Sequence, residues 1–545
     1  MPSDWTPSKH QRALYDWIDN GMGHAVVKAV AGSGKTSSIV RALERIPSRC
    51  SVLFVAFNKD IADELARRVP AHCQARTLNS FGVKAWFSWA RSYPEVNKHK
   101  TSNLLRSILS YAEGDAYGAE IETLVALAKS HGVVPAGASH FQGLMPDCPE
   151  TWKYFIERYG IAIKAQDRDR AMIRVSQVLK EGIKTSRSVI DYDDQLYMPV
   201  IAGADFPQFD FVFGDEVQDW SPVQRTMIKR ALKPTGRFIG VGDENQAIYG
   251  FRGAASDSID KIIEEFRATV LPLSVTYRCP RSVVALAQKL VPEIEAAANA
   301  VEGVVESPSS YRVSDFTPAD LVVCRCTAPL VSLAYRIIGQ GVPCRVLGKD
   351  IGQGLITLID KLDVRTIDGP DGLYIRLGKW EDKESLSFAL ADRPGLAQSV
   401  HDKADSLRAI MDSRHDLETA ANLKDAIRTT FAPENSKANV LTLATIHKAK
   451  GLDADNVWLL NPDLLPGRWA TQDWELQQER NLEYVAYTRA KQALRLISDT
   501  GLCGQDGRPL TVKKRPSKEP KPLTPSQKAR IENEIFGALK VGARR

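Results

Sequence analysis

The stretch that most constrains the fold is HAVVKAVAGSGKTSSIVRALERI, residues 24–46. A short apolar run ends in a Gly-rich turn, and an amphipathic helical pattern follows directly. This order predicts a buried strand, a loop and a helix whose N-terminus faces an anion, with backbone N–H groups and the Lys35 ammonium around a phosphate. The strict pattern GxxxxGKS/T fails, because Ala29 stands at the first glycine position. The context still favours a phosphate-binding loop over an incidental Gly/Ser turn.

Similar apolar runs recur along the chain and end in polar or Gly-rich turns. They read SVLFVAFNKD, FDFVFGDE, GRFIGVGDE, ADLVVCRC and DNVWLLNP. Runs of this length, rich in Val, Ile and Phe, are typical of buried parallel strands that carry function at their C-terminal ends. Helical patterns such as KDIADELARRV follow several of them. The core is therefore predicted to be α/β.

The strand pattern is interrupted twice, and 545 residues are enough for several domains. The predicted boundaries are 1–92 and 190–274 for a first α/β domain, 93–189 for a helical insertion in it, 275–362 and 437–512 for a second α/β domain, 363–436 for a small insertion of mixed character, and 513–545 for a Pro/Lys-rich tail. The tail ends in a helix predicted to begin near Thr524. It is either a solvated linker with a terminal helix or a basic arm for nucleic acid or a protein partner.

The composition, with 43% hydrophobic and 25% charged residues, is that of a globular protein able to bury large cores. A net charge of +6 permits a polyanionic partner but does not identify one. Cys324 and Cys326 lie close together, but no second ligand pair follows at zinc spacing, so we expect reduced core thiols. No window approaches a membrane span and no secretory signal is evident, so we expect a cytoplasmic protein, or one in the host cytoplasm if it is viral.

A second motif lies at the end of the run FDFVFGDEVQD, where Asp215 and Glu216 are adjacent. At a strand end the first carboxylate can order Mg²⁺ through water, and the second can act as general base on the attacking water. A surface turn also uses Asp-Glu, so the pair alone decides nothing. Together with the phosphate loop, in which Thr36 can hold Mg²⁺, it indicates hydrolysis of a nucleoside triphosphate.

A third motif, GDENQAIYGFRGA, joins Asp243 and Gln246 to two aromatic residues and an arginine within a few positions. With LSVTYRCP, LTLATIHKAKGLDADNVWLL and QQERNLEYVAYTRAKQAL, and with TPSKHQRALYDWI, VAFNKDIADEL and TLNSFG near the N-terminus, the chain resembles the superfamily-one helicases of the UvrD/Rep type over residues 6 to about 495. The resemblance implies two RecA-like P-loop domains, each interrupted by an inserted subdomain, the first mainly helical. It places ATP and Mg²⁺ between the two domains.

The resemblance also assigns site residues. The implied catalytic residues are Lys35, Glu216, Gln246, Arg278 and Arg489, and the implied Mg²⁺ ligands are Thr36 and Asp215. The residues implied to contact the nucleotide are Gln11, Ala31, Gly32, Ser33, Gly34, Lys35, Thr36, Ser37, Tyr277, Arg278, Gly451, Asp453 and Arg489. The residues implied to contact DNA are Phe57, Asn58, Asn79, Tyr249, Phe251, Arg252, His447 and Lys448. Aromatic faces grip single strands without reading their sequence. Phe57, Tyr249 and Phe251 could alternatively be core residues, Arg489 a surface arginine and Arg278 a salt-bridge partner.

The chain departs from the family at three positions. Asn79 stands where His is common, Val217 where an aromatic residue is common, and Asp453 where Glu is usual, which shortens the reach of Asp453 toward the nucleotide. The segment DYDDQLYMP, from Asp191, resembles the acidic segment that closes the family's first insertion, and no catalysis is assigned to it. The second insertion is short beside the accessory subdomain of the best-known relatives, so translocation is better supported than unwinding.

The implied function is an ATP-dependent DNA helicase that moves 3′ to 5′ on single strands and at single/double-strand junctions, in a setting of DNA repair or replication. The alternatives are a translocase that strips proteins without unwinding, an RNA motor, and a nucleic-acid scaffold with a decayed ATP site. We expect a monomer in solution, no membrane partner, and a possible protein partner at the basic tail.

Overall fold

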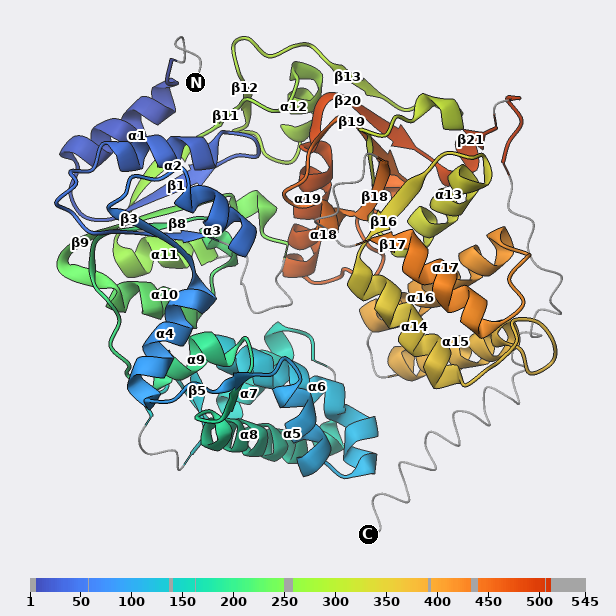
Figure 1. Ribbon diagram of the computed structural model, residues 1–545, viewed down its shortest axis with the longest axis horizontal. Coiled ribbons are helices and arrows are strands. Elements are labelled where there is room, and N and C mark those ends of the chain that lie inside the picture. The colour runs from blue at the N-terminus through green and yellow to red at the C-terminus, as the bar shows by residue number, and fades with distance from the viewer. Residues whose placement is uncertain are drawn as a thin grey trace. The chain divides into compact units, whose positions relative to one another are not determined.

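The computed structural model describes residues 6–56, 58–136, 141–161, 163–248, 258–390, 394–432, 440–504 and 506–510. The chain divides into two compact units (Figure 1). The first is Met1–Tyr277 with Glu293–Ala297, and the second is Arg278–Pro292 with Ala298–Arg545. Among the described residues, no helix has the length and apolar character needed to cross a membrane.

The first unit is built on a six-stranded parallel sheet with the strand order β10-β1-β9-β8-β2-β3. Its strands are β1 (Ala25–Ala29), β2 (Val52–Ala56), β3 (Cys73–Thr77), β8 (Phe209–Gly214), β9 (Leu232–Gly242) and β10 (Thr269–Leu273). Strand β1, next to the edge strand β10, places Val26 opposite Gly240 of β9 and Val270 of β10. Four of these strands lie on predicted apolar runs, and the prediction of buried parallel strands is confirmed for them.

Helices cover both faces of this sheet. One face carries α1 (Lys9–Asn20), α2 (Lys35–Glu44) and α3 (Lys59–Ala66), and the other carries α4 (Leu78–Ala90), α10 (Pro222–Arg230) and α11 (Ser258–Phe266). Successive side chains of a strand point to opposite faces. Val27 therefore packs in the cluster that contains Ile39 of α2, whereas Val26 packs in the cluster that contains Ile262 of α11.

The segment between α4 and β8 is mainly helical. It contains α5 (Lys100–Ile108), α6 (Tyr111–His131), α7 (Pro149–Arg158), α8 (Arg168–Thr185) and α9 (Asp194–Ile201), with the short parallel pairs β4 (Glu95–Val96) with β7 (Val189–Ile190) and β5 (Val133–Val134) with β6 (Met145–Pro146). Its own core surrounds Trp152 and Phe155. The limits 93–189 stay a prediction.

The second unit is built on a seven-stranded parallel sheet with the order β13-β20-β19-β15-β18-β16-β17. Its strands are β13 (Val304–Glu306), β15 (Leu321–Cys324), β16 (Cys344–Leu347), β17 (Phe431–Ala432), β18 (Leu441–Thr445), β19 (Ala454–Leu460) and β20 (Ala490–Ile497). The flanking helices are α12 (Arg281–Ala287), α13 (Thr327–Gly339), α18 (Ile446–Ala449) and α19 (Asp473–Tyr487). Two further parallel pairs are β11 (Val275–Thr276) with β12 (Glu295–Ala296), in the first unit, and β14 (Tyr311–Arg312) with β21 (Leu502–Cys503), in the second.

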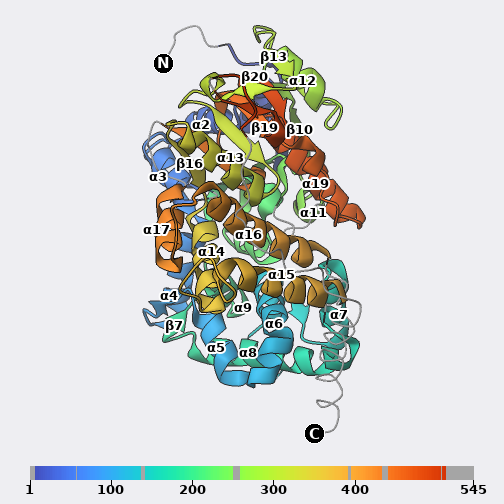
Figure 2. The same ribbon diagram turned by 90° about the vertical axis from the view of Figure 1, so that its right-hand side faces the viewer.

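The part of the second unit predicted to be a small insertion of mixed character, 363–436, is mainly helical in its described residues and also contains the two-residue strand β17. Its limits stay a prediction. After α14 (Lys349–Leu362), the chain forms α15 (Leu373–Leu390), α16 (Pro394–Ser413) and α17 (Ala420–Thr430), and α15 packs along α16 (Figure 2). Apolar residues recur at helical spacing: Leu373 and Leu377 are four apart, and Leu407 and Met411 are four apart, all fully buried. Only one β-bridge, Thr366 to Thr419, crosses the described part of this segment outside the named strands.

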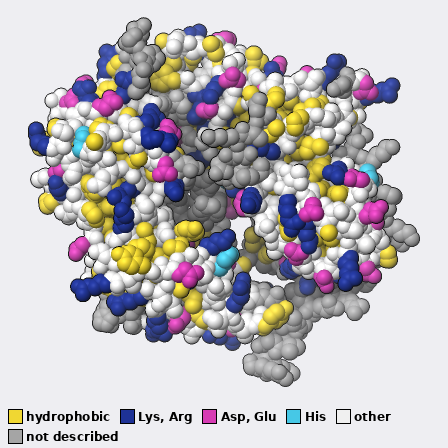
Figure 3. Space-filling model, viewed as in Figure 1, with side chains coloured by type: hydrophobic (Ala, Val, Ile, Leu, Met, Phe, Trp, Pro, Cys, Tyr) yellow, Lys and Arg dark blue, Asp and Glu magenta, His cyan; other side chains and the backbone are white. Residues whose placement is uncertain are grey.

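The α/β fold with parallel sheets is thus established for both units. That each unit is RecA-like, and that each carries an inserted subdomain, remain inferences from the resemblance. All eight cysteines are free thiols, and Cys324 is fully buried at the end of β15. On the face shown in Figure 3, Lys and Arg side chains are interspersed with Asp and Glu and do not form one continuous basic field.

Candidate functional site

The phosphate loop joins β1 to α2 at the C-terminal edge of the first sheet. Gly32 and Gly34 have φ angles of 71° and 74°, the left-handed region in which a side chain is disfavoured. No side chain caps the N-terminus of α2, although capping is the usual way to satisfy its first N–H groups. The Ser33 hydroxyl is buried and has no hydrogen-bond partner among the described residues. Unsatisfied buried donors at a helix N-terminus suit a phosphate.

Lys35, the first residue of α2, is paired with the predicted base. Its Nζ lies 2.8 Å from Oε1 of Glu216, and both side chains are largely buried. Burial acts to lower the pKa of Lys35, but the carboxylates of Glu216, Asp215 and Asp243 outweigh it, so the pKa is raised. Lys35 therefore carries its positive charge at the mouth of the phosphate loop at any physiological pH.

The acidic pair follows β8 directly, as predicted. Asp215 is buried and its Oδ1 accepts the Glu216 N–H at 3.0 Å. Glu216 itself has a φ of 51°, an unusual backbone conformation for a residue with a side chain. The Gln218 amide donates to Oε2 of Glu216, so both carboxylate oxygens of Glu216 are held. Such local strain is found at functional sites, where the surrounding structure fixes the residue.

Asp243 and Gln246 lie at the end of the neighbouring strand β9 and contact each other. The Gln246 amide donates to Asp243 Oδ2, and the Asp243 N–H donates to Gln218 Oε1 at 3.1 Å. Burial raises the pKa of Asp243 to about 6, although the Lys35 ammonium acts against this. Gln218, which the sequence analysis did not single out, therefore connects Glu216 to Asp243. Its position two residues after Glu216 was the available signal.

Gln11 and Tyr277 flank the phosphate loop. Gln11 is buried in α1, and its Nε2 donates to Ser38 Oγ of α2 at 3.0 Å. The Tyr277 N–H donates to the Gly32 carbonyl at 2.8 Å, and its ring is half exposed. A Cβ at Gly34 would lie 3.9 Å from Gln11 Nε2 and 4.0 Å from the Tyr277 ring. Tyr277 belongs to the first compact unit, whereas the predicted boundary assigns it to the second domain.

The predicted residues of the second unit form a separate cluster. Arg489 is almost fully buried, and its guanidinium donates to the carbonyls of Val485 at 2.9 Å and Leu452 at 3.2 Å. Burial, helped by the nearby Arg278, lowers the pKa of Arg489 to about 10. The alternative of a surface arginine is therefore wrong for Arg489.

Arg278 does form a salt bridge, the other alternative that the sequence left open. Its Nε lies 3.2 Å from Oδ2 of Asp453, and the Lys491 ammonium lies 2.6 Å from the other Asp453 oxygen. Asp453 thus holds two cations of its own unit. Gly451, two residues earlier, has a φ of 91° that only glycine adopts readily.

The predicted DNA-contacting residues are only partly described. Asn58 is exposed and caps α3 by accepting the Ile61 N–H at 2.9 Å. Asn79, in α4, donates to the Tyr192 carbonyl at 2.8 Å. His447 and Lys448 lie in α18, immediately after β18, and Lys448 pairs with Asp350 at 3.1 Å. The remaining members lie outside the described residues: Phe57, Tyr249, Phe251, Arg252 and the tail 513–545.

The residues present fit a magnesium nucleotide. Thr36, the second residue of α2, and Asp215, after β8, are adjacent to the Lys35 and Glu216 pair in the chain and carry oxygen donors that suit Mg²⁺. Within the described ranges, no three His, Cys, Asp or Glu side chains form a cluster that would hold a metal ion by themselves. A site of two protein oxygens completed by phosphate oxygens and water is the usual form for Mg²⁺.

Comparisons with known proteins identify the family to which the chain belongs. The family model described as the UvrD/REP helicase N-terminal domain matches residues 12–267, and the UvrD-like helicase C-terminal domain matches residues 395–500. The chain is 24% identical over 512 residues to F-box DNA helicase protein 1 of Schizosaccharomyces pombe, covering 87% of this chain and 55% of that protein. It is 25% identical over 550 residues to the ATP-dependent DNA helicase UvrD2 of Mycobacterium tuberculosis, covering 87% and 76%.

A shorter alignment, to the probable DNA helicase II homolog of Mycoplasma pneumoniae, is 33% identical over 312 residues and covers 54% of this chain and 43% of that protein. The chain spans about half the length of the two F-box helicases it matches. Among solved structures, an arterivirus nonstructural protein 10 (helicase) has a TM-score of 0.31 at 14% identity over 90% of this chain and 61% of that one, too weak a likeness to argue from. One domain model matches most of the first unit and the other matches part of the second, and the chain belongs to the superfamily-one helicases of the UvrD/Rep type.

Proposed function

We propose that the chain is an ATP- and Mg²⁺-dependent motor that translocates 3′ to 5′ along single-stranded DNA and couples hydrolysis to duplex unwinding or protein displacement. The observation that carries the proposal is the buried ion pair of Lys35 with Glu216 beneath the phosphate loop. It joins the residue that would bind the triphosphate to the residue that would activate water. The matches to UvrD-type helicase domains support the DNA substrate.

The chemistry follows from the competition for Lys35. A triphosphate in the loop would draw the Lys35 ammonium toward its β- and γ-phosphates and release Oε1 of Glu216. That oxygen could then accept a proton from the attacking water, while Gln218 keeps the carboxylate in place through Oε2. Mg²⁺, held by Thr36 and Asp215, would neutralise charge on the phosphate oxygens. Gln246 would orient the water or sense its departure.

The second unit would supply Arg278 and Arg489 to the γ-phosphate. Arginines brought to a transferring phosphoryl group are worth roughly 10³ to 10⁵ in rate. Their contribution would depend on closure of the two units over the nucleotide, which couples hydrolysis to movement. Gln11 and Tyr277, on either side of the loop, would hold the adenine by its edge and its face.

Single-stranded DNA would be held by stacking and by phosphate contacts. The predicted aromatic residues lie a few positions after Gln246, so nucleotide state and base contact would be linked through one short segment. The 3′ to 5′ polarity is carried over from the UvrD/Rep resemblance alone. The preference for junctions, the monomeric state, a partner at the tail and a cytoplasmic location stay predictions from the sequence.

A strand-displacement assay with 3′-tailed and 5′-tailed duplexes tests the proposal. We expect ATP-dependent opening of the 3′-tailed duplex, no opening of the 5′-tailed one, and no activity in Lys35→Ala. Opening of only the 5′-tailed substrate would reverse the polarity. If a matched RNA strand stimulates the ATPase activity and no DNA strand does, the substrate of the motor is RNA.

A translocase that strips bound proteins without unwinding is the second candidate. The short second insertion favours it: between α14 and β18, its described residues form the helices α15 to α17 and the two-residue strand β17. In the best-known UvrD/Rep relatives the corresponding accessory subdomain is larger and often contacts duplex DNA. Removal of a protein bound to a single strand, with no opening of either tailed duplex, would favour this candidate.

A further inference from the structure

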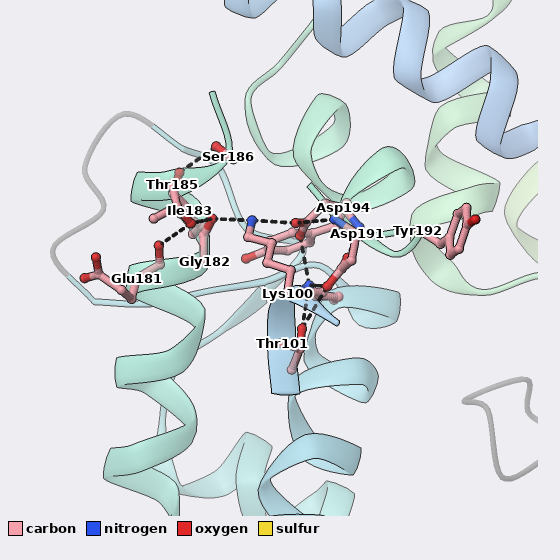
Figure 4. Close-up of polar contacts among 12 residues, drawn as sticks. Lys100, Thr101, Glu181, Gly182, Ile183, Thr185, Ser186, Asp191, Tyr192 and Asp194 are labelled. Atoms are coloured by element: carbon pink, nitrogen blue, oxygen red, sulfur yellow. Dashed lines mark hydrogen bonds and ion pairs between the residues drawn. The ribbon is translucent and has the colours of Figure 1, made fainter. Parts of the chain in front are cut away.

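Four charged side chains lie buried together in the helical part of the first unit (Figure 4). Lys100 of α5 lies 2.6 Å from Oδ2 of Asp194, the first residue of α9. Lys129 of α6 lies 2.6 Å from Oδ2 of Asp191 and 2.9 Å from Oδ1 of Asp194. Two cations and two anions balance, so the cluster is neutral as a whole. We call these four residues the buried quartet.

The quartet ties three helices to one short loop. Lys100 also donates to the Gly182 carbonyl at 2.7 Å, near the end of α8. The Thr101 hydroxyl donates to Asp191 Oδ2 at 2.8 Å. Bonds from α5 and α6 therefore converge on the carboxylates of Asp191 and Asp194, and Lys100 also links this cluster to α8 (Figure 4). Charges that are fully paired and hydrogen-bonded fix one geometry, whereas apolar side chains can repack.

The loop that carries Asp191 and Asp194 also binds the side chain of Asn79, a residue of α4 predicted to contact DNA. Reciprocal bonds fold the loop: the Asp194 N–H donates to Asp191 Oδ1 at 2.8 Å, and the Asp191 N–H donates to Asp194 Oδ2 at 3.2 Å. The carbonyl of Tyr192, inside this turn, accepts the Asn79 amide at 2.8 Å. The Gln195 amide oxygen accepts the same Asn79 nitrogen at 3.0 Å. The orientation of Asn79 is therefore set by the turn.

The helices that carry Asn79 and the turn are in backbone contact. A Cβ at Gly82 of α4 would lie 2.2 Å from the Gln195 carbonyl oxygen, so only glycine permits this approach. A chain of direct contacts thus leads from α5, α6 and α8 through the buried quartet to the turn, and from the turn to Asn79 of α4, a helix that packs on the first sheet.

We propose that Lys100, Lys129, Asp191 and Asp194 are positioning residues that set the affinity of the motor for single-stranded nucleic acid by fixing Asn79. The inference rests on the proposed function, because it assigns Asn79 to the nucleic-acid groove. The quartet touches neither nucleotide nor DNA in this role. Ion pairs of this kind are often no more stabilising than apolar residues of the same volume, so their benefit here is the single geometry that they impose on the turn.

The test measures ATPase stimulation by oligo-dT in Lys129→Met and Lys129→Arg, with Lys184→Met as the matched control. Lys184→Met removes a lysine charge from the same group of helices, but this lysine forms an exposed ion pair with Glu181. We expect Lys129→Met to raise the half-saturating oligo-dT concentration by about 3- to 30-fold, the range typical of changes to a coupling network. The DNA-free rate and the KM for ATP should stay unchanged, and Lys129→Arg should restore part of the affinity.

Two further variants distinguish a loss of positioning from misfolding of the protein. Thr101→Val removes one bond to Asp191 without burying an unpaired charge, so it should fold and show a smaller shift in the same direction. In a double variant with Asn79→Ala, Lys129→Met should add nothing to the loss of affinity. Additive losses, a fall in the DNA-free rate, or variants that match Lys184→Met would overturn the inference. Failure of oligo-dT to stimulate the unmodified chain would instead overturn the proposed function.

Discussion

The Nζ atom of Lys35 and the Oε1 atom of Glu216 lie 2.8 Å apart, although 181 positions separate the two residues in the chain. Parallel strands bring them together, because β1 and β8 both end at the same edge of the sheet, with β9 between them. The second oxygen of Glu216 is held by Gln218, and its backbone φ of 51° fixes the direction of the side chain. The carboxylate thus points to the Lys35 ammonium at the start of α2.

Glu216→Gln should abolish turnover and leave ATP binding largely intact, because the amide keeps the shape but cannot take a proton. The expected loss of kcat is about 10² to 10⁴, the usual contribution of a general base. Single-turnover hydrolysis and binding of a fluorescent ATP analogue separate the two effects. Glu181→Gln, at an exposed ion pair, serves as the control. Retained turnover in Glu216→Gln would remove this residue from the role of base.

Arg489→Lys should be nearly as inactive as Arg489→Ala. The guanidinium donates at once to the Val485 and Leu452 carbonyls, and a lysine ammonium cannot reproduce that planar fork. If Arg489 acts on the γ-phosphate, both variants should lose about 10³-fold or more in kcat. The KM for ATP should change far less. A lysine variant with near-normal kcat would show that positive charge alone is sufficient.

Asp453→Asn should act through Arg278. The carboxylate holds the Arg278 guanidinium at 3.2 Å, and the amide would weaken that hold without changing the shape of the side chain. We expect a drop in kcat of about tenfold, the equivalent of about 1.4 kcal/mol. In an Arg278→Ala background the same substitution should have no further effect. A full effect in that background would indicate direct contact of Asp453 with the nucleotide, as the resemblance implies.

Local sequence patterns predicted the strands and the phosphate loop because these depend on residues that are close in the chain. The run ending at Ala29, the glycines of the loop and the Asp215–Glu216 pair each reveal their structure within a few positions. The contacts of Arg278 and Arg489 did not follow from such patterns. Burial of Arg489 and the Asp453 partner of Arg278 result from contacts between distant segments.

The buried quartet was not predicted from the sequence, because its members come from distant parts of the chain. Lys100 and Asp194 are 94 positions apart, and each reads alone as a surface charge. Their burial is possible only because both charges are neutralised by partners from other helices. A single sequence holds no signal for such pairing. Gln218 was accessible in principle, since it belongs to the same strand end as Glu216.

Asp243→Asn should stabilise the protein at neutral pH. Burial raises the pKa of Asp243 to about 6 from an ordinary value of 3.8. Between these values the unfolded chain has lost the proton and the folded chain has kept it, so folding stability falls as the pH rises. The full cost above pH 6 is about 3 kcal/mol, from 1.36 kcal/mol for each pKa unit. The asparagine avoids this cost, and Gln246 can turn its amide to keep a hydrogen bond.

Urea unfolding of both proteins at several pH values checks this prediction. The stability gained by Asp243→Asn should be small near pH 4.5, grow up to about pH 6, and stay constant above about pH 7. Asp210→Asn is the control, because hydrogen bonding to Lys233 lowers the pKa of Asp210 to about 2. Its contribution is complete above pH 4, so this substitution should destabilise by an amount that does not change across the same range. A constant gain for Asp243→Asn from pH 4.5 to 7 would show that Asp243 keeps its charge in the folded protein.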